Sequence, residues 1–243
     1  GLDDWGKLVE PGTYRVRGLT HTGLDAVYEM SFYNPGTPPW KTADGTGGWG
    51  ADHSPPQHVA RAGKVMIIAA HTAEGGSGII GIGADGKRLW GEKRGATVLA
   101  ADDEFVYFIM NHWGERGLCR LSARDGSFAP IKYKGKLRFP VELKEIFGEP
   151  KPAPATAMAA HDGRLALALD DDRVVLLDGG SAAVLKTVKV PHPAALAFAD
   201  ADTLFAISKT GIVRVDLETG ALAPVKTPGV KRPTAIAVDG DGN

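Results

Sequence analysis

Cysteine is almost missing from this chain, in which Cys119 is the single cysteine. One thiol excludes an intrachain disulfide and a four-cysteine metal site. The neighbouring residues, Gly117 to Leu121, form a strand-like run, so we expect Cys119 to fill a buried space rather than to act as a reactive thiol. The cysteine content therefore excludes these two kinds of stabilising cross-link, and it does not indicate the cellular compartment.

Long hydrophobic runs and an excess of charge of one sign are also absent. No stretch reaches the roughly 18 consecutive apolar residues of a membrane-spanning helix. The net charge of -1 offers no basic field that would attract nucleic acid or an anionic membrane. No signal peptide is recognisable at Gly1, and a start without Met suggests a processed chain. We expect an exported bacterial protein, extracellular or periplasmic.

A repeat of about 40 residues organises most of the chain. A hydrophobic residue followed by Ala opens a short apolar run at five places, led by Val59, Leu99, Met158, Leu196 and Ile236. The spacings between these leading residues are 40, 59, 38 and 40. Later in each of the first four units comes a turn with glycine, at Asp85-Gly86, Asp125-Gly126, Asp178-Gly179 and Thr219-Gly220.

Each unit has room for four short strands. In the last full unit the expected strands are Ala195–Phe198, Thr203–Ile207, Ile212–Asp216 and Leu222–Val225. Four strands in about 40 residues are typical of a propeller blade, which hides its apolar faces only against neighbouring blades. The sequence predicts an all-β propeller with four full repeats and a partial fifth that begins at Thr234.

The long interval between the second and third units contains extra residues. The excess lies in 134–153, a segment rich in Lys, Glu and Pro that contains Leu143–Phe147, where we expect one helical turn. Insertions into repeats form loops on one face, where binding often takes place.

Two segments resemble known repeat families. Gly83–Trp90 looks like the signature of quinoprotein-type repeats, and Thr234–Asn243 resembles the opening of an NHL-type repeat. The resemblance covers about residues 56–243 and implies a propeller in which Trp90 packs between blades. No complete set of quinone-binding residues is recognisable, so no cofactor is predicted.

The first 58 residues form a separate region, followed by the blades at 59–243. Strands are expected at Thr13–Arg17 and Ala26–Tyr33. Pro11–Val16 is similar to the end of FlgD-like immunoglobulin modules of large secreted bacterial proteins. Two alternatives stay open: residues 13–33 supply strands that close the ring, or the chain is a piece of a longer protein.

The long loop from Asn34 to His58 contains candidate binding residues. Trp40 and Trp49 can stack against sugar rings, or simply pack the loop over blade edges. Asp52 and His53, with His58, can offer two or three ligands to a divalent metal, although no compact ligand motif is present. The alternative is that Asp52 and His53 fix the loop by hydrogen bonds.

Two histidines follow equivalent strands in adjacent units. His71 follows Val65–Ala70, and His112 follows Phe105–Met110, with Asn111 and Trp113 beside it. Equivalent strand ends lie on one face of a propeller, where paired histidines suit proton abstraction or metal binding. The alternative is that both histidines sit in solvated loops.

Two classes of function follow. The first is a non-catalytic binding or scaffold module that recognises a protein or glycan partner through the propeller face, the 34–58 loop and the 134–153 insertion. The second is a propeller lyase or hydrolase that uses His71 and His112. Converging histidines in a concave polar pocket would favour the enzyme, and separated side chains on a broad face would favour the scaffold.

Overall fold

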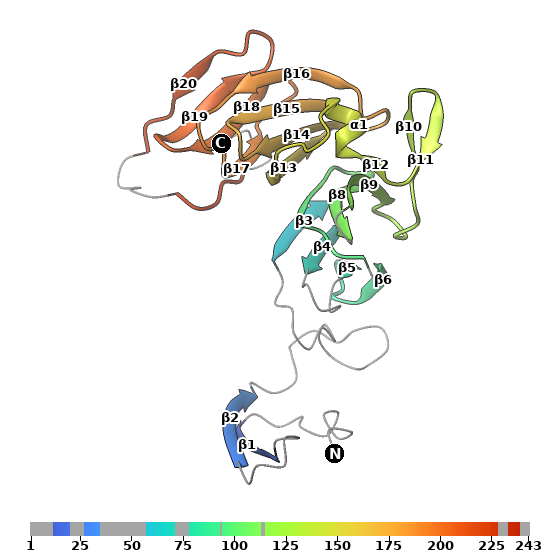
Figure 1. The fold of residues 1–243 in the computed structure, drawn as a ribbon, viewed down its shortest axis with the longest axis vertical. Coiled ribbons are helices and arrows are strands. Elements are labelled where there is room, and N and C mark those ends of the chain that lie inside the picture. The colour runs from blue at the N-terminus through green and yellow to red at the C-terminus, as the bar shows by residue number, and fades with distance from the viewer. Residues whose placement is uncertain are drawn as a thin grey trace. The chain divides into compact units, whose positions relative to one another are not determined.

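The structure is a computed structural model, and it describes residues 12–19, 27–34, 57–70, 78–92, 94–112, 115–227 and 233–238 (Figure 1). Contacts divide the chain into two compact units, one of residues 1–50 and 85–88 and the other of residues 51–84 and 89–243. In the first unit, β1 (Gly12–Leu19) and β2 (Val27–Asn34) pair as an antiparallel hairpin, which confirms the two expected strands. Ring closure by these strands stays a prediction.

The second unit contains four antiparallel sheets of four strands each. The first sheet consists of β3 (His58–Ala62), β4 (Val65–Ala70), β5 (Gly78–Ile82) and β6 (Arg88–Glu92). The second consists of β7 (Val98–Ala101), β8 (Phe105–His112), β9 (Glu115–Ser122) and β12 (Val141–Glu142). The third consists of β13 (Ala155–His161), β14 (Arg164–Leu169), β15 (Arg173–Asp178) and β16 (Val184–Lys189). The fourth consists of β17 (Ala195–Phe198), β18 (Thr203–Ser208), β19 (Gly211–Asp216) and β20 (Leu222–Pro224).

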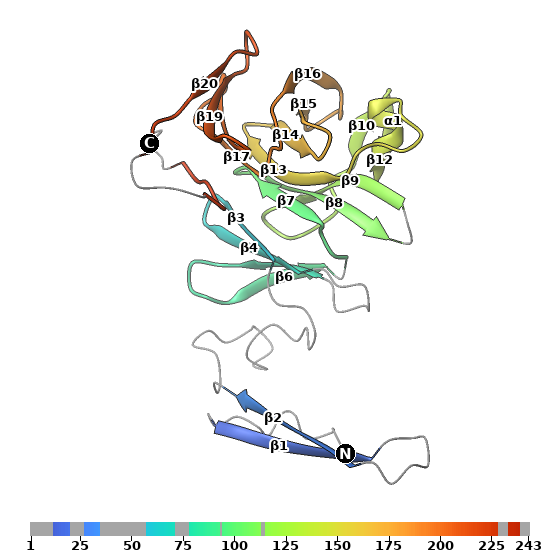
Figure 2. The ribbon, with the colours of Figure 1, turned by 60° about the vertical axis from the view of Figure 1, so that its left-hand side comes forward.

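The sheets follow one another as propeller blades. The first strand of each sheet is innermost: β7 packs against both β3 and β13, and β13 packs against β17 (Figure 2). The leading residues of the first four markers, Val59, Leu99, Met158 and Leu196, all lie in the first strand of a sheet, so the predicted apolar runs at these places are confirmed. The strands of the fourth blade agree with their expected bounds to within one residue. Among the described residues after that blade, 233–238 form no strand, so the expected first strand of a fifth blade is not seen there.

The 134–153 segment differs in part from the expected loop. Its helical turn is confirmed as α1 (Leu143–Phe147). However, Val141–Glu142 is β12, which pairs with β9 and completes the second blade. The extra residues between β9 and β12 form a hairpin of β10 (Ile131–Tyr133) and β11 (Lys136–Arg138). The segment is thus an essential part of one blade together with an added hairpin.

Three apolar clusters fill the spaces between consecutive blades. Ile67 and Phe108 belong to the cluster between the first and second blades, and both are fully buried. Tyr107 and Leu167 belong to the next cluster, which joins the second and third blades. A third cluster joins the third and fourth blades. Since a single sheet cannot cover both of its own faces, burial between neighbouring blades holds the array together.

Trp90 packs between the first two blades, as the quinoprotein resemblance implies. Its side chain is 8% exposed, and its Nε1 donates a hydrogen bond of 2.9 Å to the carbonyl oxygen of Ala123. A Cβ atom on Gly81 or Gly126 would lie 2.4 Å or 2.6 Å from an indole carbon. The two glycines therefore leave the space that the indole ring fills.

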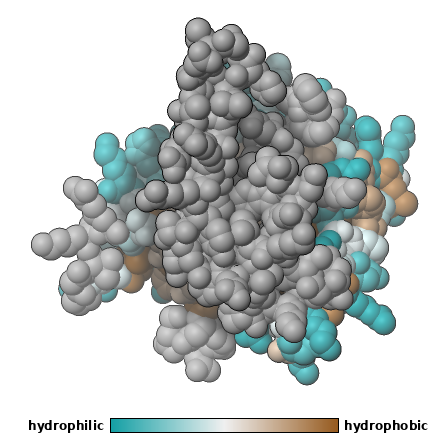
Figure 3. Space-filling view, turned by 90° about the horizontal axis from the view of Figure 1, so that it is seen from below, coloured by the Kyte–Doolittle hydropathy of each residue, from teal (hydrophilic) through white to brown (hydrophobic). Residues whose placement is uncertain are grey.

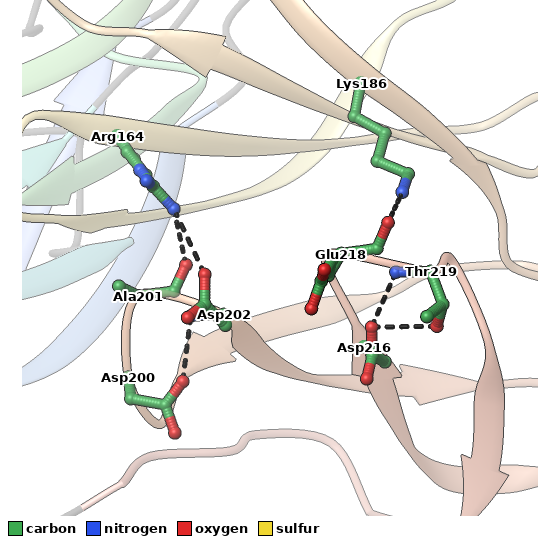
Figure 4. A network of polar contacts seen from close by, with 8 residues as sticks. All are labelled: Arg164, Lys186, Asp200, Ala201, Asp202, Asp216, Glu218 and Thr219. Atoms are coloured by element: carbon green, nitrogen blue, oxygen red, sulfur yellow. Dashed lines mark hydrogen bonds and ion pairs between the residues drawn. The ribbon is translucent and has the colours of Figure 1, made fainter.

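Polar contacts join the third and fourth blades (Figure 4). Arg164 donates a hydrogen bond of 2.7 Å to the carbonyl oxygen of Ala201 and lies 3.6 Å from a carboxylate oxygen of Asp202. Lys186 reaches the carbonyl oxygen of Glu218. Both contacts connect strands of one blade to turns of the next, so they fix the blades at their ends.

Cys119 is fully buried in β9, as expected for a structural cysteine. Burial raises the pKa of its thiol to about 12, so little reactive thiolate exists at neutral pH. We predict that the native chain resists iodoacetamide and that the chain unfolded in guanidinium chloride reacts with one equivalent. The measurement is mass spectrometry over time. Fast alkylation of the native chain would show that β9 opens readily.

Turn aspartates make the stability dependent on pH. The carboxylates of Asp85, Asp125, Asp200 and Asp216 accept hydrogen bonds from backbone amides two or three residues later. The Ser127 hydroxyl and amide together lower the pKa of Asp125 to about 2, and amide donors lower the pKa of the other three. A lowered pKa in the folded state adds stability above the unfolded-state value, near 3.8.

This stability should be lost as the pH falls from 3.8 towards about 2, while the carboxylates become protonated. We predict a lower urea midpoint at about pH 2.5 than at about pH 5. In the Asp125→Asn variant the amide oxygen still accepts hydrogen bonds but does not titrate, so its midpoint should depend less on pH. If the urea midpoint changed equally with pH in the two chains, a contribution from Asp125 would be contradicted.

Candidate functional site

Most of the predicted site residues lie outside the described residues. These are Trp40, Trp49, Asp52, His53, His71 and Trp113. His58 is described as the first residue of β3, opposite Ala69, and is half-buried. Among the described side chains, no group of three His, Cys, Asp or Glu could hold a metal ion. The metal site proposed around Asp52, His53 and His58 stays a prediction.

The backbone places Asn111 and His112 at the end of β8, where His112 pairs with Glu115. The same end of the neighbouring second strands carries Asp170, just after β14, and Ser208, the last residue of β18. The equivalence expected for His71 and His112 stays a prediction, because His71 lies outside the described residues. Convergence of His112 with His71 stays a prediction.

Two hollows in the part of the chain that the structure describes are large enough to hold a ligand. The first, the apolar hollow, lies between the hairpin, α1 and the turn from β15 to β16, and its volume is about 530 Å³. Its lining includes Tyr133, Ile146, Phe147, Ala182, Ala183 and Val184, with Lys134 and Glu145 also contributing. Pockets of roughly 300–1,000 Å³ are typical of ligand sites.

The core of the second blade holds α1 in place beside this hollow. Leu143 and Ile146 are buried, and the helix ends at Gly148, which has a positive φ of 67°. The Tyr133 hydroxyl donates a hydrogen bond of 2.6 Å to the carbonyl oxygen of Glu145. One wall of the hollow, made by the hairpin and the helix, is thus a single packed piece.

The opposite wall is the turn of the third blade, and the inserted segment is bound to that blade. The Lys132 amide donates a hydrogen bond of 2.9 Å to the carbonyl oxygen of Gly180. Arg173 in β15 binds both carboxylate oxygens of Glu149, at 2.7 and 3.1 Å. Because both walls are fixed, the hollow exists before any ligand binds.

Apolar side chains at the edge of the hollow are open to solvent. Val184 lines it and is 45% exposed, and Leu185 beside it is 52% exposed. Hydrophobic residues also lie among hydrophilic ones along the coloured margin of the face in Figure 3. Exposed apolar groups next to a preformed hollow are typical of a binding surface.

The second hollow, the polar hollow, lies on the blade face that carries the turns between first and second strands. It is lined by Arg61, by the β7–β8 turn with Asp102, Asp103 and Glu104, and by His161 and Asp162, and its volume is about 640 Å³. The His161 ring stacks on Phe198 with 5.7 Å between centroids. Three successive blades contribute to this hollow.

Asp102 has a structural role in the polar hollow. One carboxylate oxygen accepts hydrogen bonds from the Tyr107 hydroxyl at 3.2 Å and from the Gly163 amide at 3.1 Å. The other accepts from the amides of Glu104 and Phe105. With both oxygens engaged, Asp102 joins the second blade to the third.

Sequence reasoning missed most residues of both hollows. Of the segments that line the apolar hollow, the 134–153 insertion was expected to bind, but Tyr133 and the turn with Val184 were not. Charged residues recur at the first turn of successive units, at Asp102 and Asp162, and this signal could have indicated the polar hollow. No comparable signal marks the apolar hollow, because its walls are brought together only by the packing of two blades.

No protein-family model matches the chain, and no curated protein matches it. A solved structure of glutaminyl cyclase from Myxococcus xanthus is similar with a TM-score of 0.49 and 14% identity, over 77% of this chain and 82% of that one. BamB from Moraxella catarrhalis gives 0.39 and 14%, over 68% and 46%. The computationally designed Ika4 protein gives 0.47 and 14%, over 70% and 96%. The fold assignment rests on the four sheets themselves.

Among the described residues, no helix has the length and apolar character needed to cross a membrane.

Proposed function

We propose that the chain is a non-catalytic binding module that recognises a protein partner through the apolar hollow. The supporting observation is a preformed, mainly apolar space between two blades, edged by the exposed side chain of Val184. Protein interfaces are anchored by a few apolar or aromatic side chains that fill such spaces. The hairpin and α1 add this apolar surface to the second blade, whose outer edge would otherwise be the strand β12 alone.

The composition of the lining favours a protein over a glycan at this place. Sugar recognition uses stacking on aromatic faces together with several polar groups. Although Tyr133 and Phe147 are aromatic, Ile146, Ala182, Ala183 and Val184 make most of the remaining lining aliphatic. Ser181 also lines the hollow, and both its hydroxyl and its amide donate hydrogen bonds to the Asp178 carboxylate, so this contact closes the turn from β15 to β16. A carbohydrate partner at the tryptophans, the lyase or hydrolase alternative at His71 and His112, and export from the cell stay predictions.

A random peptide library displayed on phage and selected on the whole chain tests this function. Enriched peptides should bind the Val184→Glu variant at least about tenfold more weakly, because a carboxylate at the hollow would be desolvated by the anchor side chain. Binding would be measured by fluorescence polarisation.

Leu185→Glu is the matched control, since Leu185 is equally exposed but does not line the hollow. Its binding should be close to that of the unchanged chain. Failure to enrich any peptide, or equal loss in both variants, would argue against a binding site at this hollow.

A further inference from the structure

The inserted segment beside the apolar hollow has an excess of basic residues in a chain with a net charge of -1. Between residues 131 and 153, the sequence has six basic residues, Lys132, Lys134, Lys136, Arg138, Lys144 and Lys151, and three acidic ones, Glu142, Glu145 and Glu149. The segment therefore has a formal charge of 6 − 3 = +3. It is a basic region beside a mainly apolar space.

All three glutamates of this segment are already paired. Glu142 pairs with Lys144 at 2.5 Å, Glu145 with Arg138 at 3.4 Å, and Glu149 with Arg173 at 2.7 Å. Glu142 and Glu145 each have a basic partner, whereas Glu149 shares Arg173 with Asp171, which lies 2.6 Å from the guanidinium. The acidic residues thus serve to hold α1 and the hairpin in place.

Four lysines of this segment have a charge that no ion pair balances. In the part of the chain that the structure describes, Lys132, Lys134, Lys136 and Lys151 form no ion pair, and all four are exposed. Lys132 lies in β10, Lys136 lies in β11 opposite Tyr133, and Lys134 lies in the turn of this hairpin, which forms one wall of the hollow. Lys134 itself lines the hollow, with its Nζ 5.0 Å from the centre of the Tyr133 ring.

We infer, on the basis of the proposed function, that the occupant of the hollow is an acidic protein segment with one bulky apolar side chain. The apolar side chain enters between α1 and Val184, and flanking carboxylates face the hairpin lysines. Charge complementarity of this kind selects partners and speeds their association. A basic or neutral segment lacks that attraction, and basic flanks are repelled by the same lysines.

Three synthetic peptides test the inference on the whole chain. Each has one central phenylalanine, flanked on both sides by glutamates, glutamines or lysines. Since an exposed ion pair contributes up to about 1 kcal/mol, or about fivefold in affinity, several pairs should make the glutamate peptide bind at least about tenfold tighter than the glutamine peptide at low salt. High salt should shrink this difference, and the lysine peptide should bind weakest.

Two triple variants separate the local effect from net charge. Lys132→Gln with Lys134→Gln and Lys136→Gln should weaken the glutamate peptide at least about tenfold and leave the glutamine peptide unchanged. Lys64→Gln with Lys209→Gln and Lys226→Gln removes as much charge from other exposed positions and should change neither.

The outcomes distinguish this inference from the proposed function. If the glutamate and glutamine peptides bind equally and neither binds the Val184→Glu variant, the inference of an acidic partner is wrong, but the proposed binding site is supported. If the glutamate peptide binds regardless of Val184→Glu, the hollow is not its site and the inference fails. Self-association of the chain that is lost in Val184→Glu would overturn it in favour of a second copy.

Discussion

Replacing Trp90 by alanine should lower the free energy of unfolding by about 3–5 kcal/mol. The indole ring is almost fully buried between the first two blades, and its loss leaves a cavity lined by glycine. The carbonyl oxygen of Ala123 also loses its donor. Urea unfolding followed by circular dichroism measures the change, because this signal does not depend on the tryptophan itself.

Leu89 provides the matched control for this substitution. It precedes Trp90 in β6 but is 52% exposed, so Leu89→Ala should change the free energy of unfolding by less than about 1 kcal/mol. Trp90→Phe should fall between the two, since it keeps an aromatic ring and loses the hydrogen bond. A small effect of Trp90→Ala would mean that the first blade contributes little to the stability of the array.

Gly126→Ala should have the second-largest effect, about 2–5 kcal/mol of destabilisation. Gly126 has a φ of 69°, where a side chain costs about 1–2 kcal/mol. Its Cβ would also lie 2.6 Å from an indole carbon of Trp90, and overpacking of this kind costs about 1–3 kcal/mol. Urea unfolding of the Gly126→Ala variant, followed by circular dichroism, measures the sum of the backbone and steric costs.

A double-mutant cycle separates these two costs. Gly81→Ala meets the same indole at 2.4 Å, and Gly81 is not among the residues with positive φ, so its cost should be steric only. In the Trp90→Ala background, Gly81→Ala should become nearly neutral, while Gly126→Ala should still cost about 1–2 kcal/mol. Additive effects in both cases would contradict the contact between the glycines and the ring.

The repeat period was enough to predict the blades, because each blade is a local unit whose strands are consecutive in the sequence. The markers at Leu99, Met158 and Leu196 indicated the inner strands correctly. The exception is the second blade, whose fourth strand, Val141–Glu142, has only two residues. Such a short strand has no detectable alternation, and the preceding hairpin moved it far from its expected position.

The candidate site was much less predictable than the fold. The insertion was expected to bind, but the apolar hollow needs Tyr133 and Val184, which are far apart in the sequence and belong to different blades. Their meeting depends on how adjacent sheets pack, which a repeat pattern does not encode. Only the basic character of residues 131–153 is visible in the sequence itself.

The attachment of Glu149 to Arg173 also bears on how the array comes apart. In a repeat array, each blade is stabilised by contacts with its nearest neighbours. The second and third blades share an apolar cluster and are joined further by the inserted segment. Local opening elsewhere in the array should therefore leave the second and third blades together, with the proposed binding surface between them intact.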